Sequence, residues 1–109
     1  MKTQVQNFLK YHHLNPHVYE MFKGYIKEVK DAGKTKYSAR TILHRMRWHA
    51  NIETRRIDEF KIGDHHSPYY ARMYMHQWPD DEGFFSVKNI TGLADFDEWL
   101  YRTFEVTPT

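Results

Sequence analysis

Residues 67–79 read SPYYARMYMHQWP. Ser67 is placed to cap a helix, and Pro68 suits the first helical position because its φ is already fixed near the helical value. Pro79 ends the pattern, so the stretch predicts a helix over 68–78. The apolar residues at helical spacing are expected to face inward: Ala71, Tyr74, Met75 and Trp78. The opposite face is then left outside: Tyr69, Arg72, Met73, His76 and Gln77.

The same signals predict helices elsewhere in the chain. Asn15 followed by Pro16 repeats the cap-plus-proline start. Ser38 is placed to cap a helix that runs to about Asn51. The predicted helices outside 68–78 are a short one before Asn15, one over about 16–31, the one from Ser38 to about Asn51, and one over about 94–104.

Short strands are predicted between these helices. The segment RRIDEFKIGDHH (55–66) contains spaced apolar residues before a Gly-Asp turn, which is typical of a strand. The segment FFSVKNI (84–90) follows a turn at Gly83 and alternates in the same way. Tyr37 is expected to pair briefly as a strand.

This order of elements is that of winged-helix domains, in which the third helix enters the DNA major groove and the next strand belongs to the wing. We therefore predict a mainly helical α+β fold that is winged-helix-like, a helix-turn-helix with a short β wing, followed by a C-terminal helix. A length of 109 residues fits one domain, 1–109. Its core is expected over about 15–90, with the C-terminal helix at about 94–104.

Composition excludes several classes of protein. The chain is 40% hydrophobic, above the share of disordered chains, yet no apolar run approaches the roughly 18 residues of a membrane helix. It contains no cysteine, which excludes disulfides, thiol catalysis and thiolate metal sites. The opening MKTQVQNFLKYHH lacks an apolar signal core, so a cytoplasmic location is expected.

Charge is divided unevenly along the chain. Residues 1–56 hold twelve Lys/Arg and four Asp/Glu (+8), and residues 57–109 hold four and ten (−6), which sum to the net +2. A basic half of this kind suits a polyanion such as DNA, or an acidic protein surface. The alternative is that the two halves attract each other across the fold.

DNA binding is the function that this pattern favours. Arg and Gln side chains can contact guanine and adenine edges, while Tyr and His bind phosphates. The 68–78 helix is the predicted reading helix, the two helices before it carry phosphate anchors, and the wing supplies one lysine. The predicted DNA-binding residues are Tyr69, Arg72, His76 and Gln77 of the reading helix, the anchors Lys23, Lys27, Arg40, His44 and Arg47, and Lys88 of the wing.

Two catalytic or metal-dependent alternatives are weaker. The eight histidines include His44 and His49, which are five apart, whereas helical metal ligands are usually three or four apart, and no H-E-x-x-H pattern supports a site. Three acidic residues beside Lys61 loosely match a nuclease: Asp58, Glu59 and Asp64. Such short strings are common by chance, so no catalytic residue, metal or cofactor is predicted.

The acidic residues of the second half of the chain suggest an alternative function, which is binding to a protein. Asp80, Asp81 and Glu82 are most simply a solvated turn, but together with the acidic residues of 95–98 they would form a face that imitates DNA phosphates. Such a face would let a counter-defence protein bind a host factor. Trp48 falls beside the apolar face of its helix and is expected to cover the core edge rather than to stack on bases.

Five motifs spread over most of the chain carry a resemblance to known sequences: NPHVYEMF (15–22), RMRWHANIET (45–54), FKI (60–62), YYARMYM (69–75) and GFF (83–85). The chain resembles small phage- and prophage-encoded proteins of uncharacterised families. The resemblance implies a phage-type origin and names no catalytic residue. We therefore predict a non-catalytic, phage-type DNA-binding protein in replication or transcription control. The alternative is a phage accessory protein that binds a host protein through its acidic face.

Overall fold

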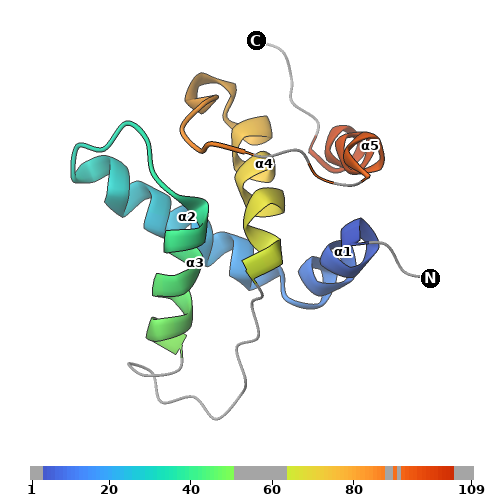
Figure 1. Cartoon of the computed structure of the whole chain (residues 1–109), viewed down its shortest axis with the longest axis horizontal. Coiled ribbons are helices and arrows are strands. Elements are labelled where there is room, and N and C mark those ends of the chain that lie inside the picture. Colours follow the sequence, from blue (N-terminus) through green and yellow to red (C-terminus); the bar gives the residue numbers. More distant parts are fainter. Residues whose placement is uncertain (1–3, 51–63, 88–89, 91, 105–109) are drawn as a thin grey trace.

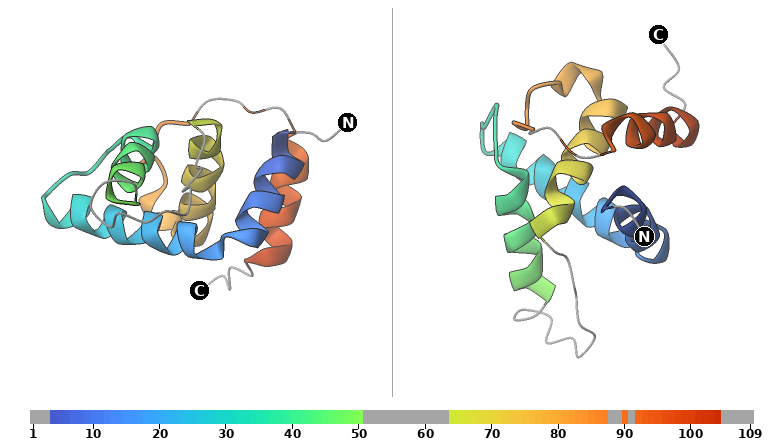
Figure 2. Two further views of the ribbon diagram at one scale, coloured as in Figure 1. Left: turned by 90° about the horizontal axis from the view of Figure 1, so that it is seen from below. Right: turned by 45° about the vertical axis from the view of Figure 1, so that its right-hand side comes forward.

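Helix α4 (Ser67–Gln77) runs through the middle of the molecule (Figure 1). The computed structural model describes residues 4–50, 64–87, 90 and 92–104. The other elements are α1 (Gln4–Leu14), α2 (Pro16–Asp31), α3 (Ala39–Trp48), α5 (Leu93–Thr103) and the short 3-10 turns η2 (Asp64–His66) and η3 (Pro79–Asp81). Helix α3 lies on one side of α4, and α1 and α5 lie on the other (Figures 1 and 2). Helix α2 packs against α1, α3 and α4.

The described residues form helices and turns without a β-strand, so the predicted α+β fold with a β wing is wrong. Tyr37 makes one isolated parallel bridge with Phe85, and its N–H donates to the Phe84 carbonyl at 3.1 Å. Phe84 and Phe85 are neighbours and both are buried, whereas neighbours in a strand point to opposite faces. Burial of both rings prevents this segment from acting as a wing. The strand predicted within 55–66 falls largely outside the described residues.

The helix starts follow the sequence signals in part. The helices predicted before Asn15 and over 16–31 are confirmed, and Ser38 caps α3 by accepting a hydrogen bond from the Thr41 N–H at 3.2 Å. The cap predicted at Asn15 is wrong, because its side-chain amide donates instead to the Tyr11 carbonyl at 3.0 Å and closes α1. The cap predicted at Ser67 is also wrong, since Ser67 is already helical and His66 occupies the N-cap position.

The core is built from aromatic rings around Tyr70 of α4, which is fully buried. The Tyr70 ring lies 4.9 Å from Phe8, 6.1 Å from Tyr19 and 5.6 Å from Phe22, measured between ring centroids. Phe8 also packs 5.9 Å from Phe96 of α5. Aromatic rings bury a large apolar area, and pairs at these distances also favour particular relative orientations of the rings. One hydrophobic cluster thus joins all five described α-helices, and it extends beyond the predicted 15–90.

The faces predicted for α4 are wrong at several positions. Tyr69 and Met73, expected outside, are buried, whereas Trp78, expected inside, is 41% exposed. Met75 is half-buried against the core. A helix enclosed on more than one side buries a wide arc, so a single-face pattern does not describe it.

Two histidines belong to this aromatic core. His12 lies 5.8 Å from Trp99 and 6.0 Å from Tyr19, and His66 lies 4.6 Å from Tyr11, between ring centroids. Among the described residues, Nδ1 of each histidine is buried without a hydrogen-bond partner. Burial, helped by the adjacent His13 and His65, lowers the pKa of His12 and His66 below the usual value.

We expect acidification to weaken the fold through His12 and His66. A lowered folded-state pKa means that the unfolded chain binds these protons more tightly, so the stabilisation is present above pH about 6.5 and is lost as the pH falls. The variant H12F/H66F keeps the rings and should flatten this loss, while the control His17→Gln, at an exposed position, should retain it. Urea unfolding at a series of pH values measures both. A wild-type stability that is constant between about pH 7 and 5 would contradict the assignment.

Two glycine variants are expected to change stability in opposite directions. An added Cβ at Gly24, inside α2, meets nothing within 4 Å, so Gly24→Ala should raise the free energy of unfolding by about 0.8–1 kcal/mol. Gly92 has a φ of +79°, and its added Cβ would lie 2.9 Å from Val5 Cγ2. Gly92→Ala should therefore lower stability by about 1–2 kcal/mol from backbone strain and further from the clash. Denaturant titrations of both variants test this, and equal shifts would refute it.

Candidate nucleic-acid interface

Helix α3 presents one apolar and one polar face. Its buried residues are Ala39, Ile42, Leu43 and Met46. At about 100° per residue the opposite side of the helix carries the exposed positions. We call these the exposed face of α3: Arg40, Thr41, His44, Arg45 and Trp48. Arg47 is half-buried at the edge of this face, and the guanidinium of Arg45 lies 5.7 Å from the Tyr25 ring centroid.

Positive charge is concentrated on this helix and the turn before it. Residues 32–48 carry five Lys/Arg and no Asp/Glu. Lys34 and Lys36, in the turn, are exposed like Arg40 at the start of α3. Helix α5, with Asp95, Asp97 and Glu98, lies on the other side of α4 (Figure 1). The basic residues of α3 and the acidic residues of α5 are therefore separated in space.

The lysines predicted on α2 are engaged within the fold. Lys23 pairs with Glu20 at 2.8 Å, and its ammonium lies 4.8 Å from the Tyr19 ring and 5.6 Å from the Trp78 ring. Lys27 pairs with Asp31 at 3.2 Å along the exposed side of α2. Each lysine thus has a carboxylate close by, which reduces its attraction for a phosphate.

The predicted reading residues of α4 are not gathered on an open face. Tyr69 is 2% exposed, and the amide oxygen of Gln77 accepts a hydrogen bond from the Tyr19 hydroxyl. Arg72 and His76 are half-buried and face α5. Lys88 lies outside the described residues. The structure brings together Arg40, His44 and Arg47 on α3, and separates them from the residues predicted on α4.

A cleft of about 380 Å³ opens beside Arg72 and His76. Its lining residues come from α4, from the segment after η3 and from α5: Arg72, Met75, His76, Glu82, Gly83, Phe85, Val87, Asp97 and Leu100. The carboxylates of Glu82 and Asp97 offset the positive charge of Arg72. The cleft therefore does not complement a phosphate. Across the described residues, no three His, Asp or Glu side chains are grouped so as to hold a metal ion.

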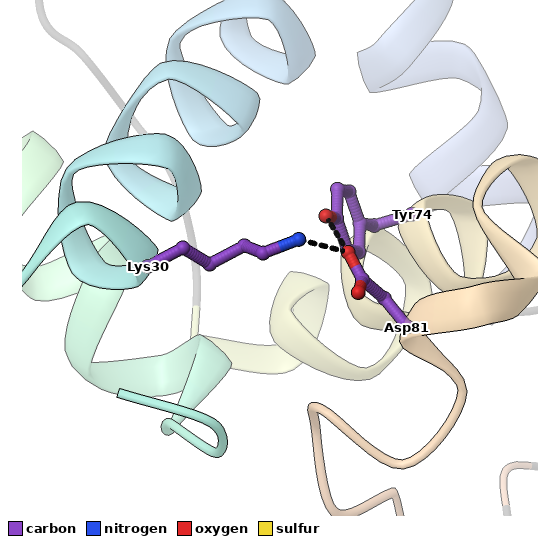
Figure 3. Close-up of polar contacts among 3 residues, drawn as sticks. All are labelled: Lys30, Tyr74 and Asp81. Carbon is purple, nitrogen blue, oxygen red and sulfur yellow. Dashed lines mark hydrogen bonds and ion pairs between the residues drawn. The ribbon is translucent and has the colours of Figure 1, made fainter. Parts of the chain in front are cut away.

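Asp81 connects α2 to the turn after α4 (Figure 3). Its carboxylate accepts hydrogen bonds from the Lys30 ammonium at 2.7 Å and from the Tyr74 hydroxyl. These donors hold the pKa of Asp81 below its usual value. Burial and the bond to Asp81 raise the pKa of Tyr74. Asp81 is thereby committed to the fold, whereas Asp80 and Glu82 are exposed.

Lys34, Lys36, Arg45 and Trp48 are exposed on or just before α3, within the candidate interface, but were not among the predicted site residues. Two signals in the sequence indicate them. The first is the absence of acidic residues over 32–48. The second is that Trp48 follows Met46 by two positions, which places it on nearly the opposite side of a helix.

Comparison with known proteins adds no family or fold relationship. The chain matches no family model, no curated protein and no solved structure. None of the helices in the described part of the chain is long and apolar enough to span a membrane.

Replacing Asp81 with Asn is expected to lower the free energy of unfolding at neutral pH by about 1 kcal/mol, because two hydrogen bonds lose their charged acceptor. A carboxylate with a lowered pKa stabilises the fold above its unfolded pKa of about 4, and this stabilisation disappears as the pH falls further. Asp81→Asn should therefore also reduce the acid sensitivity.

Urea titrations at neutral and acidic pH measure both effects. Asp80→Asn is the matched control, since Asp80 is the exposed neighbour, and its curve should follow the wild type. Equal losses in the two variants would show that the Lys30–Asp81–Tyr74 contacts contribute nothing specific.

Proposed function

We propose that this chain is a non-catalytic, phage-type DNA-binding protein that acts in the cytoplasm and contacts phosphates through the exposed face of α3. The observation that carries the proposal is the charge of residues 32–48, five Lys/Arg without an Asp/Glu. DNA phosphates attract such a surface whatever the base sequence, and binding releases the counterions held along the DNA.

The position of α3 supports this choice of surface. Helix α3 lies on the side of α4 away from the acidic α5, so the two charged regions do not neutralise each other (Figure 2). Lys34, Lys36 and Arg40 are exposed where the chain enters α3. A concentrated positive potential on one side raises the rate and strength of association with a polyanion.

Sequence-independent binding fits the arrangement better than reading of a preferred site. Gln77 is occupied by the Tyr19 hydroxyl, and Tyr69 is buried. Phosphate contacts position a protein on DNA without carrying sequence information. We therefore expect similar affinities for unrelated sequences of equal length.

A second candidate function is binding to a basic host protein through α5. Asp95 and Glu98 are exposed on this helix, and Glu98 pairs with Arg102. The predicted acidic face is smaller than the sequence indicated, because Asp81 is held by Lys30 and Tyr74. Complementary charge would steer such an encounter, as it does in other complexes of charged proteins.

Arg40→Ala and Arg47→Ala are each expected to weaken binding to every DNA sequence alike. Each lost phosphate contact should also reduce the slope of log affinity against log salt by about one. Fluorescence anisotropy with labelled DNA at several salt concentrations measures both quantities.

Arg102→Ala is the matched control, because it removes the same charge from α5 on the far side of α4. It should leave DNA affinity unchanged. Absence of wild-type binding at low salt, or an equal loss in the Arg102 variant, would remove α3 as the DNA interface.

A further inference from the structure

Trp48 stands on the exposed face of α3 with 57% of its surface exposed. Its expected role as a cover for the core edge is therefore wrong. Large apolar side chains are usually buried, and an exposed tryptophan in a small protein is informative where other features of the surface point to a ligand. The surrounding charge on α3 is such a feature.

Side chains that can bind phosphate lie next to Trp48 on α3. His44 is one turn earlier on the same face, at a spacing of four residues, and Arg45 precedes Trp48 by three. Arg47 is adjacent in sequence, at the edge of the face. An aromatic ring among arginines is the combination with which proteins bind unpaired nucleotides, because the ring stacks on a base while the cations hold phosphates.

The other exposed tryptophan has a different environment. Trp78 stacks on Tyr74 at 5.0 Å and lies beneath the Lys23 ammonium at 5.6 Å. Among the described residues, no stacked ring or overlying cation of this kind accompanies Trp48, whose side chain is among the exposed large hydrophobic ones. More than half of the Trp48 surface is exposed, whereas the Trp78 ring is already in contact with Tyr74 and Lys23.

We infer that the exposed face of α3 binds single-stranded DNA, with Trp48 stacked on an unpaired base and the neighbouring arginines on the flanking phosphates. This inference rests on the proposed DNA-binding function and specifies its substrate. In a duplex the faces of the bases are stacked on one another, so only an unpaired strand offers them to Trp48. Stacking requires no particular base, in keeping with sequence-independent binding.

The test compares a short oligothymidylate with an abasic strand of the same length, which has the same phosphates but no bases. Wild-type protein should prefer the oligothymidylate. Trp48→Ala should lose about tenfold in affinity for it and little for the abasic strand, since base–aromatic stacking is of this size. Trp48→Phe keeps a ring and should retain most of the affinity.

Tyr101→Ala is the control, because Tyr101 is 71% exposed on the acidic α5. It should bind both strands like the wild type. The oligothymidylate should also quench tryptophan emission in the wild type, and this quenching should be lost in Trp48→Phe although Trp78 and Trp99 remain.

Two outcomes would overturn the inference, and they differ in their consequence. Equal affinity for the two strands, or equal losses on both in Trp48→Ala, would show that no base stacks on Trp48 and would leave phosphate binding by α3 intact. Failure of the wild type to bind any strand or duplex at low salt would remove the proposed function as well.

Discussion

The packing of α4 around Tyr70 is the constraint on which the rest of the structure depends. Tyr70 is fully buried and contacts rings from α1 and α2, while the neighbouring Tyr69 stacks on Phe8 and packs against Phe96 of α5. A domain of this size has little apolar surface to bury, so the large rings on one helix supply much of what holds the others. Because α4 packs against other helices on more than one side, most of its large apolar side chains are buried in the core.

The enclosure of α4 determines where the molecule can meet a partner. A helix that reads DNA must present a continuous face, and α4 keeps only half-buried positions such as Arg72 and His76, beside a cleft of mixed charge. Helix α3 packs through one face alone and exposes the other. The Lys30–Asp81 ion pair links the basic and acidic halves, while the acidic residues of α5 remain on the opposite side from α3 (Figures 1 and 3). Within the part of the chain that the structure describes, the basic residues of α3 are thus kept apart from the acidic residues of α5.

The candidate site could be predicted from the sequence only in part. Arg40, His44 and Arg47 follow from helical spacing, because a helix whose apolar residues face one way exposes the others. Trp48 has the same spacing signal, but hydrophobicity favours burial, and the two arguments conflict. Gln77 was predicted to contact bases, but its amide oxygen instead accepts a hydrogen bond from Tyr19, which is distant in sequence. No local pattern contains that contact.

The sequence by itself determined the described helices of the N-terminal half, the cap at Ser38, and the division of charge, because prolines, capping side chains and apolar spacing act through neighbouring residues. Only the tertiary structure decided that 84–87 would bury two adjacent phenylalanines instead of forming a wing. It also decided which faces of α4 are covered, since that depends on α1, α2, α3 and α5 meeting around it. Burial depends on the assembled fold. The spacing of apolar residues along one helix does not show how many other helices will pack against it.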